Sequence, residues 1–283
     1  MNSKVKEIII KTKKRLFGAN LGNNVSIFQG NGLDFSEIKE YNFGDDVKKI
    51  NWKVTAKEQK PYINVFNEER ELNIVFCFMV SGNIYFGSVR QKQEVMAEIA
   101  TIIGYSAVKN SDKFTSIFFS DKEEKIFSPS KSINSVYSML EYAIELDALQ
   151  KEVDYNKLSE YLLQRLKQKS IIFIVGDFYE EADLKYLASK HEVYAIAVRD
   201  KFEEDPKFDS EISVIDPKSL KSEHLFIDKD VLKNFREEIE KRDKKLIENF
   251  IKNSIAFIKV YTNEDAFVKL SSMFGGRRWK SYS

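Results

Sequence analysis

The stretch from Leu72 to Gly87, LNIVFCFMVSGNIYFG, constrains the fold more than any other part of this sequence. Residues 72 to 80 are apolar apart from Asn73, and the run ends abruptly at Ser81 and Gly82. A short apolar run that ends in small polar residues is typical of a strand buried on both faces, with a loop at its carboxyl end. In open α/β sheets such loops form the crevice in which ligands bind.

Segments with helical and strand periodicity alternate along the rest of the chain. Apolar spacing predicts helices at about 4–17, 46–59, 92–109, 132–145, 155–167, 181–190, 229–253 and 264–274. Strand-like runs lie at 62–66, 114–120, 171–175, 193–198 and 256–260, with shorter candidates at 125–127 and 212–215. The buried stripe predicted for the helix at 229–253 is Val231, Phe235, Ile239, Leu246 and Phe250. Alternating strands and helices require a mostly parallel sheet covered by helices on both faces, so we predict an α/β, Rossmann-type fold.

The residues up to Arg70 do not follow this alternation of strands and helices. We therefore predict an N-terminal helix and insert over residues 1–70 and an α/β domain over residues 71–283. One face of the first helix is formed by Val5, Ile8, Ile9, Thr12 and Leu16, while its lysines lie elsewhere. This pattern predicts a helix that packs on its own domain. The alternative is peripheral attachment to an anionic membrane surface or to an acidic partner.

Composition excludes several classes of protein. Cys77 is the sole cysteine, so no intramolecular disulfide can form, and a mid-strand position predicts a packing role for its thiol. Two histidines, His191 and His224, exclude a multi-His metal site. A net charge of +1 gives no indication of nucleic-acid binding. No apolar run approaches the roughly 18 residues of a membrane span, and the N-terminal apolar segment is too short for a signal peptide, so we expect a cytoplasmic protein.

The insert carries two glycine-containing turns. Gly30 and Gly32 form a G-x-G fragment that lacks the third glycine and the preceding strand of a dinucleotide-binding fingerprint. The second turn ends in Asp45 and Asp46. Either carboxylate could cap the helix that follows, and we favour capping over the alternative of a cation site.

These residues resemble a known bacterial family, the domain of unknown function 58 family. Its pattern is G-x-G-x-[DE]-F followed by Y-x-x-G-D-D-x-[RK]-x-I-[DN]-W. The residues that carry the resemblance here are Gly30, Gly32, Asp34, Phe35, Tyr41, Gly44, Asp45, Asp46, Lys49, Ile50, Asn51 and Trp52. The resemblance implies a von Willebrand factor A-like sheet with an N-terminal β-containing insert. It also implies an association with a MoxR-type AAA+ ATPase and its client proteins.

The resemblance also implies a metal-ion-dependent adhesion site built from D-x-S-x-S, a later Thr and a later Asp. In this chain Met79 stands at the leading Asp, Asn83 at the second Ser, and Asp154 lies near the expected Thr. Asp177 aligns with the last carboxylate. Mg²⁺ requires oxygen ligands, and a thioether is a soft ligand, so we expect a degenerate site with no tight metal and no other cofactor. Weak candidates are Ser81, Asn83 and Asp177.

We therefore predict a non-enzymatic adaptor that binds its partner through the loops at the end of the sheet. The residues predicted on this surface are Ser81, Gly82, Asn83, Asp154, Asp177 and Phe178. The alternative is a metal-dependent hydrolase that uses Asp177 with Asp45 or Asp46. Large aromatic side chains are mostly buried, so we expect Tyr41 and Trp52 in the core of the insert, with a role in recognition as the alternative.

Overall fold

The computed structural model describes residues 2–18, 35–66, 71–206, 210–215, 217, 220–227 and 229–275. The chain divides into two compact units. The smaller unit is residues 29–71, and the larger unit combines residues 1–28 with residues 72–283. Three residues of the family motif, Gly30, Gly32 and Asp34, lie outside the described residues.

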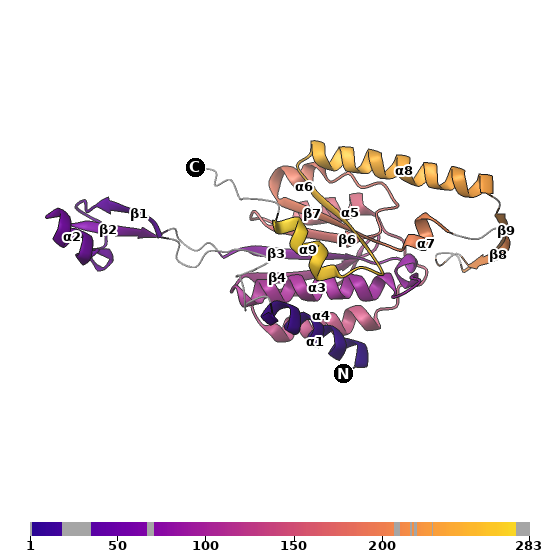
Figure 1. Cartoon of the computed structure of the whole chain (residues 1–283), viewed down its shortest axis with the longest axis horizontal. Helices are drawn as coiled ribbons and strands as arrows, with labels where there is room; N and C mark the ends of the chain where they lie inside the picture. The colour runs from indigo at the N-terminus through magenta and orange to yellow at the C-terminus, as the bar shows by residue number, and fades with distance from the viewer. Residues whose placement is uncertain are drawn as a thin grey trace. The chain divides into compact units, whose positions relative to one another are not determined.

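A six-stranded sheet forms the centre of the larger unit (Figure 1), with strand order β10–β7–β6–β3–β4–β5. Its strands are β3 (Asn73–Met79), β4 (Lys113–Phe119), β5 (Glu123–Ser130), β6 (Ile171–Gly176), β7 (Glu192–Arg199) and β10 (Ala256–Tyr261). All neighbouring pairs are parallel except the antiparallel pair of β4 with the edge strand β5. This is the doubly wound strand order, with β3 at its centre. The predicted Rossmann-type α/β fold, a mostly parallel sheet flanked by helices, is confirmed.

Helices cover both faces of this sheet, as Figure 1 shows. One face is covered by α1 (Ser3–Gly18), α3 (Lys92–Lys109), α4 (Ile133–Glu145) and α9 (Ala266–Gly275), and the other by α5 (Tyr155–Arg165), α6 (Lys185–Lys190) and α8 (Lys229–Lys252). Successive strand residues point to opposite faces. Phe76 and Phe78 therefore enter the first core, while Val75 and Cys77 enter the second. The thiol of Cys77 is fully buried, and burial raises its pKa, in agreement with a packing role.

Helix α1 packs on the larger unit. All five residues of its predicted apolar face are buried, and the helix contacts α3 and α4. Its basic side chains pair with the same unit: Lys4 with Glu94, Lys11 with Glu98, and Arg15 with Asp265. The prediction that grouped this helix with the insert is therefore wrong, because its apolar face belongs to the main core. None of the helices in the described ranges combines the length and apolar character that a membrane crossing needs.

The region from Arg199 to Ile227 is more ordered than the sequence analysis predicted. It contains α7 (Lys201–Glu204) and a separate antiparallel pair, β8 (Ser210–Ile215) with β9 (Ser222–Ile227), instead of one edge strand. The predicted stripe of α8 holds at Phe250, which is buried. It is wrong at Val231 and Phe235, which are exposed, because the start of α8 buries Leu232 instead.

The smaller unit is an antiparallel pair with one short helix. Strand β1 (Phe35–Glu40) pairs with β2 (Tyr62–Phe66), and the segment between them forms the 3-10 helix η2 (Val47–Lys49) and the helix α2 (Trp52–Glu58). The prediction of one continuous helix over residues 46–59 is wrong. Ile50 forms a β-bridge with Ile63, and Asn51 then begins α2 as its N-cap.

The described side chains of this smaller unit are mostly exposed or half-buried. Among the side chains described between residues 37 and 64, Ile63 alone is buried. Trp52 is 70% exposed and Tyr41 is half-buried. The expectation that Trp52 belongs to a core is therefore wrong, because neither η2 nor α2 buries a side chain that could pack against it.

Candidate functional site

The loops after β3 and β6 lie at the switch point of the sheet. The chain leaves β3 toward α3 on one face and leaves β6 toward α6 on the other. Ligands of doubly wound proteins bind at this position. The structure brings two of the predicted residues together here, because the side-chain amide of Asn83 donates to Asp177 Oδ2 at 3.2 Å.

Ser81 and Gly82 hold the first loop in place. Ser81 is buried and begins the 3-10 helix η3 (Gly82–Tyr85), where its carbonyl accepts the N–H of Ile84. The N–H of Gly82 donates to the carbonyl of Lys151 at 3.2 Å, and any Cβ at Gly82 would overlap Pro217. Both residues therefore have packing roles that leave little of them for a partner to contact.

Phe178 is also buried, in contrast to its predicted place on a partner-binding surface. Its φ of +53° turns the chain after β6, and its N–H donates to the hydroxyl of Tyr155 at 3.0 Å. The two rings stack with centroids 4.5 Å apart. Burial raises the pKa of Tyr155, followed by the charge of Asp177, so its hydroxyl stays protonated beside this turn.

Asp154 lies in a different environment. It is the N-cap of α5, and its Oδ1 accepts the N–H groups of Asn156 and Lys157 at 3.0 and 2.9 Å. It lines a cavity of about 500 Å³ whose other charged walls include Asp121 and Lys151. Among the interactions of the described residues, no hydrogen bond or ion pair joins Asp154 to Asp177. The capping role therefore accounts for its conformation.

A buried lysine accompanies Asp177. Lys92 is the first residue of α3, and its side chain is 1% exposed. Its Nζ lies 2.6 Å from Glu203 Oε1 and 3.8 Å from Asp177 Oδ2, and it faces the ring of Tyr179 at 5.6 Å. Burial raises the pKa of Glu203, and the charge of Lys92 opposes that rise. The loop face thus contains a positive charge that belongs to the chain itself.

A second buried cation, Arg199, ends β7. Its Nε and Nη2 donate to the carbonyl oxygens of Asp177 and Phe178, at 2.7 and 3.1 Å. Its Nη1 lies 3.0 Å from Glu204 and 2.8 Å from Asp243, which belongs to α8. Arg199 therefore links the loop after β6 to α7 and α8.

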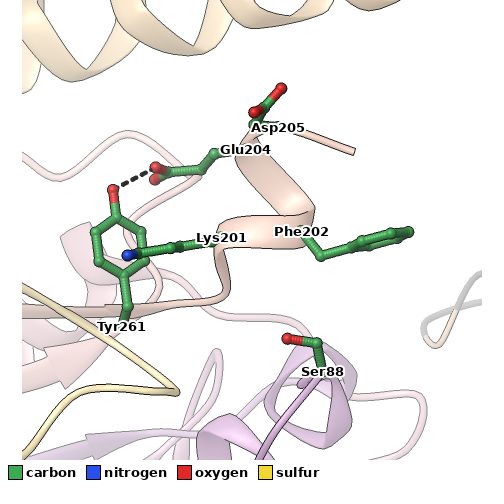
Figure 2. A pocket seen from close by; sticks show the side chains of 6 residues that line it. All are labelled: Ser88, Lys201, Phe202, Glu204, Asp205 and Tyr261. Carbon is green, nitrogen blue, oxygen red and sulfur yellow. Dashed lines mark hydrogen bonds between the residues drawn. The ribbon is translucent and has the colours of Figure 1, made fainter. Parts of the chain in front are cut away.

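A cavity of about 420 Å³ opens beside this network and is drawn in Figure 2. Glu204 accepts the hydroxyl of Tyr261 at 2.6 Å, and Lys201 lies over the ring of Tyr261 at 5.4 Å. Phe202 points away from Tyr261 and stacks on Phe86 instead. Both acidic groups of the cavity are thus already paired within the protein, Glu204 with Tyr261 and Asp205 with Arg236.

The donor set at the loop face does not fit a tightly bound dication. No group of three or more His, Cys, Asp or Glu residues in the described part of the chain could hold a metal ion. Met79 is buried in the second core and offers a thioether, which hard cations bind poorly. One oxygen of Asp177 accepts from Asn83 and faces Lys92.

The carboxylates of the smaller unit are engaged locally. Asp45 accepts the N–H of Asn42 at 2.9 Å and pairs with Lys39 at 3.1 Å, and these two contacts lower its pKa in that order. Asp46 caps η2 by accepting the N–H of Lys48 at 3.0 Å. Capping and turn formation, the favoured interpretation of this pair, account for both side chains.

The sequence analysis did not assign roles to Lys92, Arg199 and Glu203. Lysine, arginine and glutamate are almost never fully buried unless they are paired, so residue type alone gives no reason to expect their burial. One feature of the sequence could have indicated that Lys92 has a charged partner. Lys92 begins a helix whose first turn has a positive dipole end, where a cation is unfavourable without a partner.

The fold and this site define a Rossmann-type α/β protein. Ion pairs within the chain hold the loops at the switch point of its sheet. The chain belongs to the family described as "Protein of unknown function DUF58", whose model matches residues 37–247. It is 22% identical over 198 residues to uncharacterized proteins of Mycobacterium tuberculosis and Mycobacterium bovis, a match that covers 68% of this chain. The chain spans 62% of the length of these curated relatives.

Solved structures with a similar arrangement share little sequence with this chain. The conserved hypothetical protein BatB from Bacteroides thetaiotaomicron aligns with a TM-score of 0.45 and 10% identity, over 72% of this chain and 98% of BatB. An aerotolerance-related membrane protein from Bacteroides fragilis aligns with a TM-score of 0.44 and 8% identity, over 73% of this chain and all (100%) of that protein.

Proposed function

We propose that this protein is a non-enzymatic adaptor for a MoxR-type AAA+ ATPase in the assembly or maturation of another protein complex. The observation that carries the proposal is the exposure of Trp52, which is 70% accessible in the middle of the family motif. Tryptophan is highly buried on average, and it is enriched among the residues that dominate binding energies at interfaces. An exposed tryptophan on an ordered segment supports a role in binding.

The polar residues of the motif support the backbone around Trp52. Gly44 adopts a φ of +105°, which favours glycine, and Asp45 closes the same turn. Asn51 caps α2 by accepting the N–H of Val54 at 3.1 Å, and its amide donates to Asn64 at 2.8 Å. These contacts hold η2 and α2, neither of which buries a side chain, and the indole of Trp52 is left for a partner.

The charges near Trp52 indicate the chemistry of that partner. Four lysines of η2 and α2 are exposed, and none forms an ion pair with another described residue: Lys48, Lys49, Lys53 and Lys57. Glu58 is the sole acidic residue in these two elements. Phe43, which precedes η2, and Val47, the first residue of η2, are also exposed. An acidic protein surface with an apolar pocket complements this combination.

A pull-down with a MoxR-type ATPase held in its ATP state by a non-hydrolysable analogue tests the proposal. The immobilised full chain should retain the ATPase, and the retention should be weaker after Trp52→Ala. Tyr186→Ala provides the matched control, because Tyr186 is an aromatic of similar exposure in α6 of the larger unit. Failure to retain the ATPase in every nucleotide state would count against the adaptor function.

A further inference from the structure

We infer that Phe86 and Phe202, together with the cavity beside Phe202, form a second binding surface of this protein. Its occupant is a segment of another protein in which a large apolar side chain lies next to a carboxylate. The surface belongs to the larger unit and does not include Trp52. Binding at this surface therefore does not depend on the adaptor function.

The two aromatic rings stack on each other, and both remain accessible to solvent. Phe86 is 39% exposed, Phe202 is 42% exposed, and their ring centroids lie 6.3 Å apart. Val89 follows Phe86 in the segment between η3 and α3 and is 67% exposed. Single apolar side chains on a surface are ordinary, whereas apolar side chains that gather at one place mark interaction sites.

One buried carboxylate fixes both of the segments that carry these rings. Asp200 is fully buried, and it accepts the backbone N–H groups of Ser88 and Phe202, each at 2.8 Å. It also accepts the hydroxyl groups of Ser88 and Thr262. The segment after Phe86 is thus tied to the start of α7. A surface that is held in place before binding loses less conformational entropy when a partner arrives.

The charge of the cavity is positive where a partner could reach it. Lys201 is exposed, and no carboxylate of the described residues forms an ion pair with it; its Nζ lies over the ring of Tyr261 at 5.4 Å. Each acidic residue of the lining, in contrast, has a basic partner within the chain. Complementary charges favour association, so the partner group that suits Lys201 is a carboxylate.

The cavity combines this cation with an aromatic wall, as Figure 2 shows. Its volume is about 420 Å³, and clefts of about 300–1,000 Å³ are typical of ligand sites. An apolar side chain in the cavity would pack on Phe202, and a carboxylate next to it in sequence would pair with Lys201. A peptide segment supplies both groups, whereas a small inorganic anion would leave the rings in contact with water.

A selection from a phage-displayed library of random peptides tests this surface. The bait is the full chain with Trp52→Ala, so that the binding surface of the proposed function does not contribute. The selected peptides should be enriched in Asp or Glu next to Phe, Leu or Trp. Fluorescence anisotropy with a labelled selected peptide should show at least about tenfold weaker binding after Phe202→Ala or after Lys201→Glu.

The matched controls are Tyr186→Ala and Lys185→Glu, each made in the same bait chain. They alter an exposed pair on α6, in which Lys185 Nζ lies over the ring of Tyr186 at 5.8 Å. Both control variants should bind the selected peptide as tightly as the bait chain does. Circular dichroism verifies that each variant is folded, and if Phe202→Ala does not fold, Lys201→Glu decides.

Three results would overturn the inference. The first is a selection that yields no peptides, or peptides without the paired acidic and apolar residues. The second is a selected peptide that binds equally well after Lys201→Glu. The third is a dimer of the wild-type chain in sedimentation equilibrium that Phe202→Ala dissociates, because the occupant of the surface would then be a second copy of this chain.

Discussion

Arg199 donates from its Nε to the carbonyl oxygen of Asp177 at 2.7 Å, so a buried cation at the end of β7 fixes the loop that follows β6. The same guanidinium lies 2.8 Å from Asp243 of α8 and 4.2 Å from the ring of Tyr179. This contact is buried at both ends. It explains how contacts within the chain hold the loop after β6 in place.

Arg199→Met should lower the free energy of unfolding by about 3–5 kcal/mol. The carbonyl oxygens of Asp177 and Phe178 lose their buried donor, and Glu204 and Asp243 keep Lys259 as their cationic partner but lose the guanidinium. Urea unfolding followed by circular dichroism measures the change. The matched control is Arg242→Met, which removes an exposed pair with Glu238 and should change the free energy by about 0.5 kcal/mol or less. Similar values for the two variants would contradict the role assigned to Arg199.

Tyr155→Phe should destabilise the fold by about 1–3 kcal/mol, because the buried N–H of Phe178 loses its acceptor. Gly176→Ala should also destabilise it, by about 1–3 kcal/mol, since a Cβ at Gly176 would overlap the Tyr155 hydroxyl and Met79. Removing the hydroxyl relieves part of that overlap. The double variant should therefore lose less stability than the sum of the single variants, and strict additivity in urea unfolding would refute the contact.

Much of this fold could be predicted from the sequence, because burial on both faces leaves an unambiguous pattern. The central strand at residues 72–80 and the helix at residues 92–109 were both predicted close to their observed limits. Trp52 was misplaced because the average burial of tryptophan does not hold in a segment whose described side chains are nearly all exposed or half-buried. Lys92 was missed as a buried cation because its two partners lie 85 and 111 residues further along the chain.

The acid sensitivity of the fold should depend in part on Asp200. Burial by itself raises the pKa of Asp200, but hydrogen bonds from Thr262, Ser88 and Phe202 outweigh it and hold the pKa below its usual value. The pKa of Asp200 is lower in the folded chain than in the unfolded chain. The ionised carboxylate therefore stabilises the fold at pH values above the unfolded pKa of about 3.8, and this stabilisation is lost as the pH falls through the folded pKa.

Asp200→Asn tests this pH dependence. The difference in unfolding free energy between the wild-type chain and Asp200→Asn should be constant near neutral pH. It should shrink as the pH falls below about 4. The measurement is a series of urea titrations between pH 3 and pH 7. A difference that grows toward low pH would mean that Asp200 is protonated in the folded state.

Trp52→Ala separates a binding role from a structural one. The side chain is exposed and belongs to a helix with no buried residues, so its loss should change the unfolding free energy by about 0.5 kcal/mol or less. Thermal unfolding measures this. A loss of several kcal/mol would mean that Trp52 packs in a core, and the proposed role of Trp52 in binding would lose its support.

The most direct test of the adaptor function is the dissociation constant of the full chain with a MoxR-type ATPase in its ATP state, measured by biolayer interferometry for the wild-type chain, Trp52→Ala and Tyr186→Ala. Trp52→Ala should weaken binding at least about tenfold, as expected for an interface hot spot. Tyr186→Ala should leave the constant unchanged. Equal affinity of Trp52→Ala and the wild-type chain, or no binding by the wild-type chain, would contradict the account.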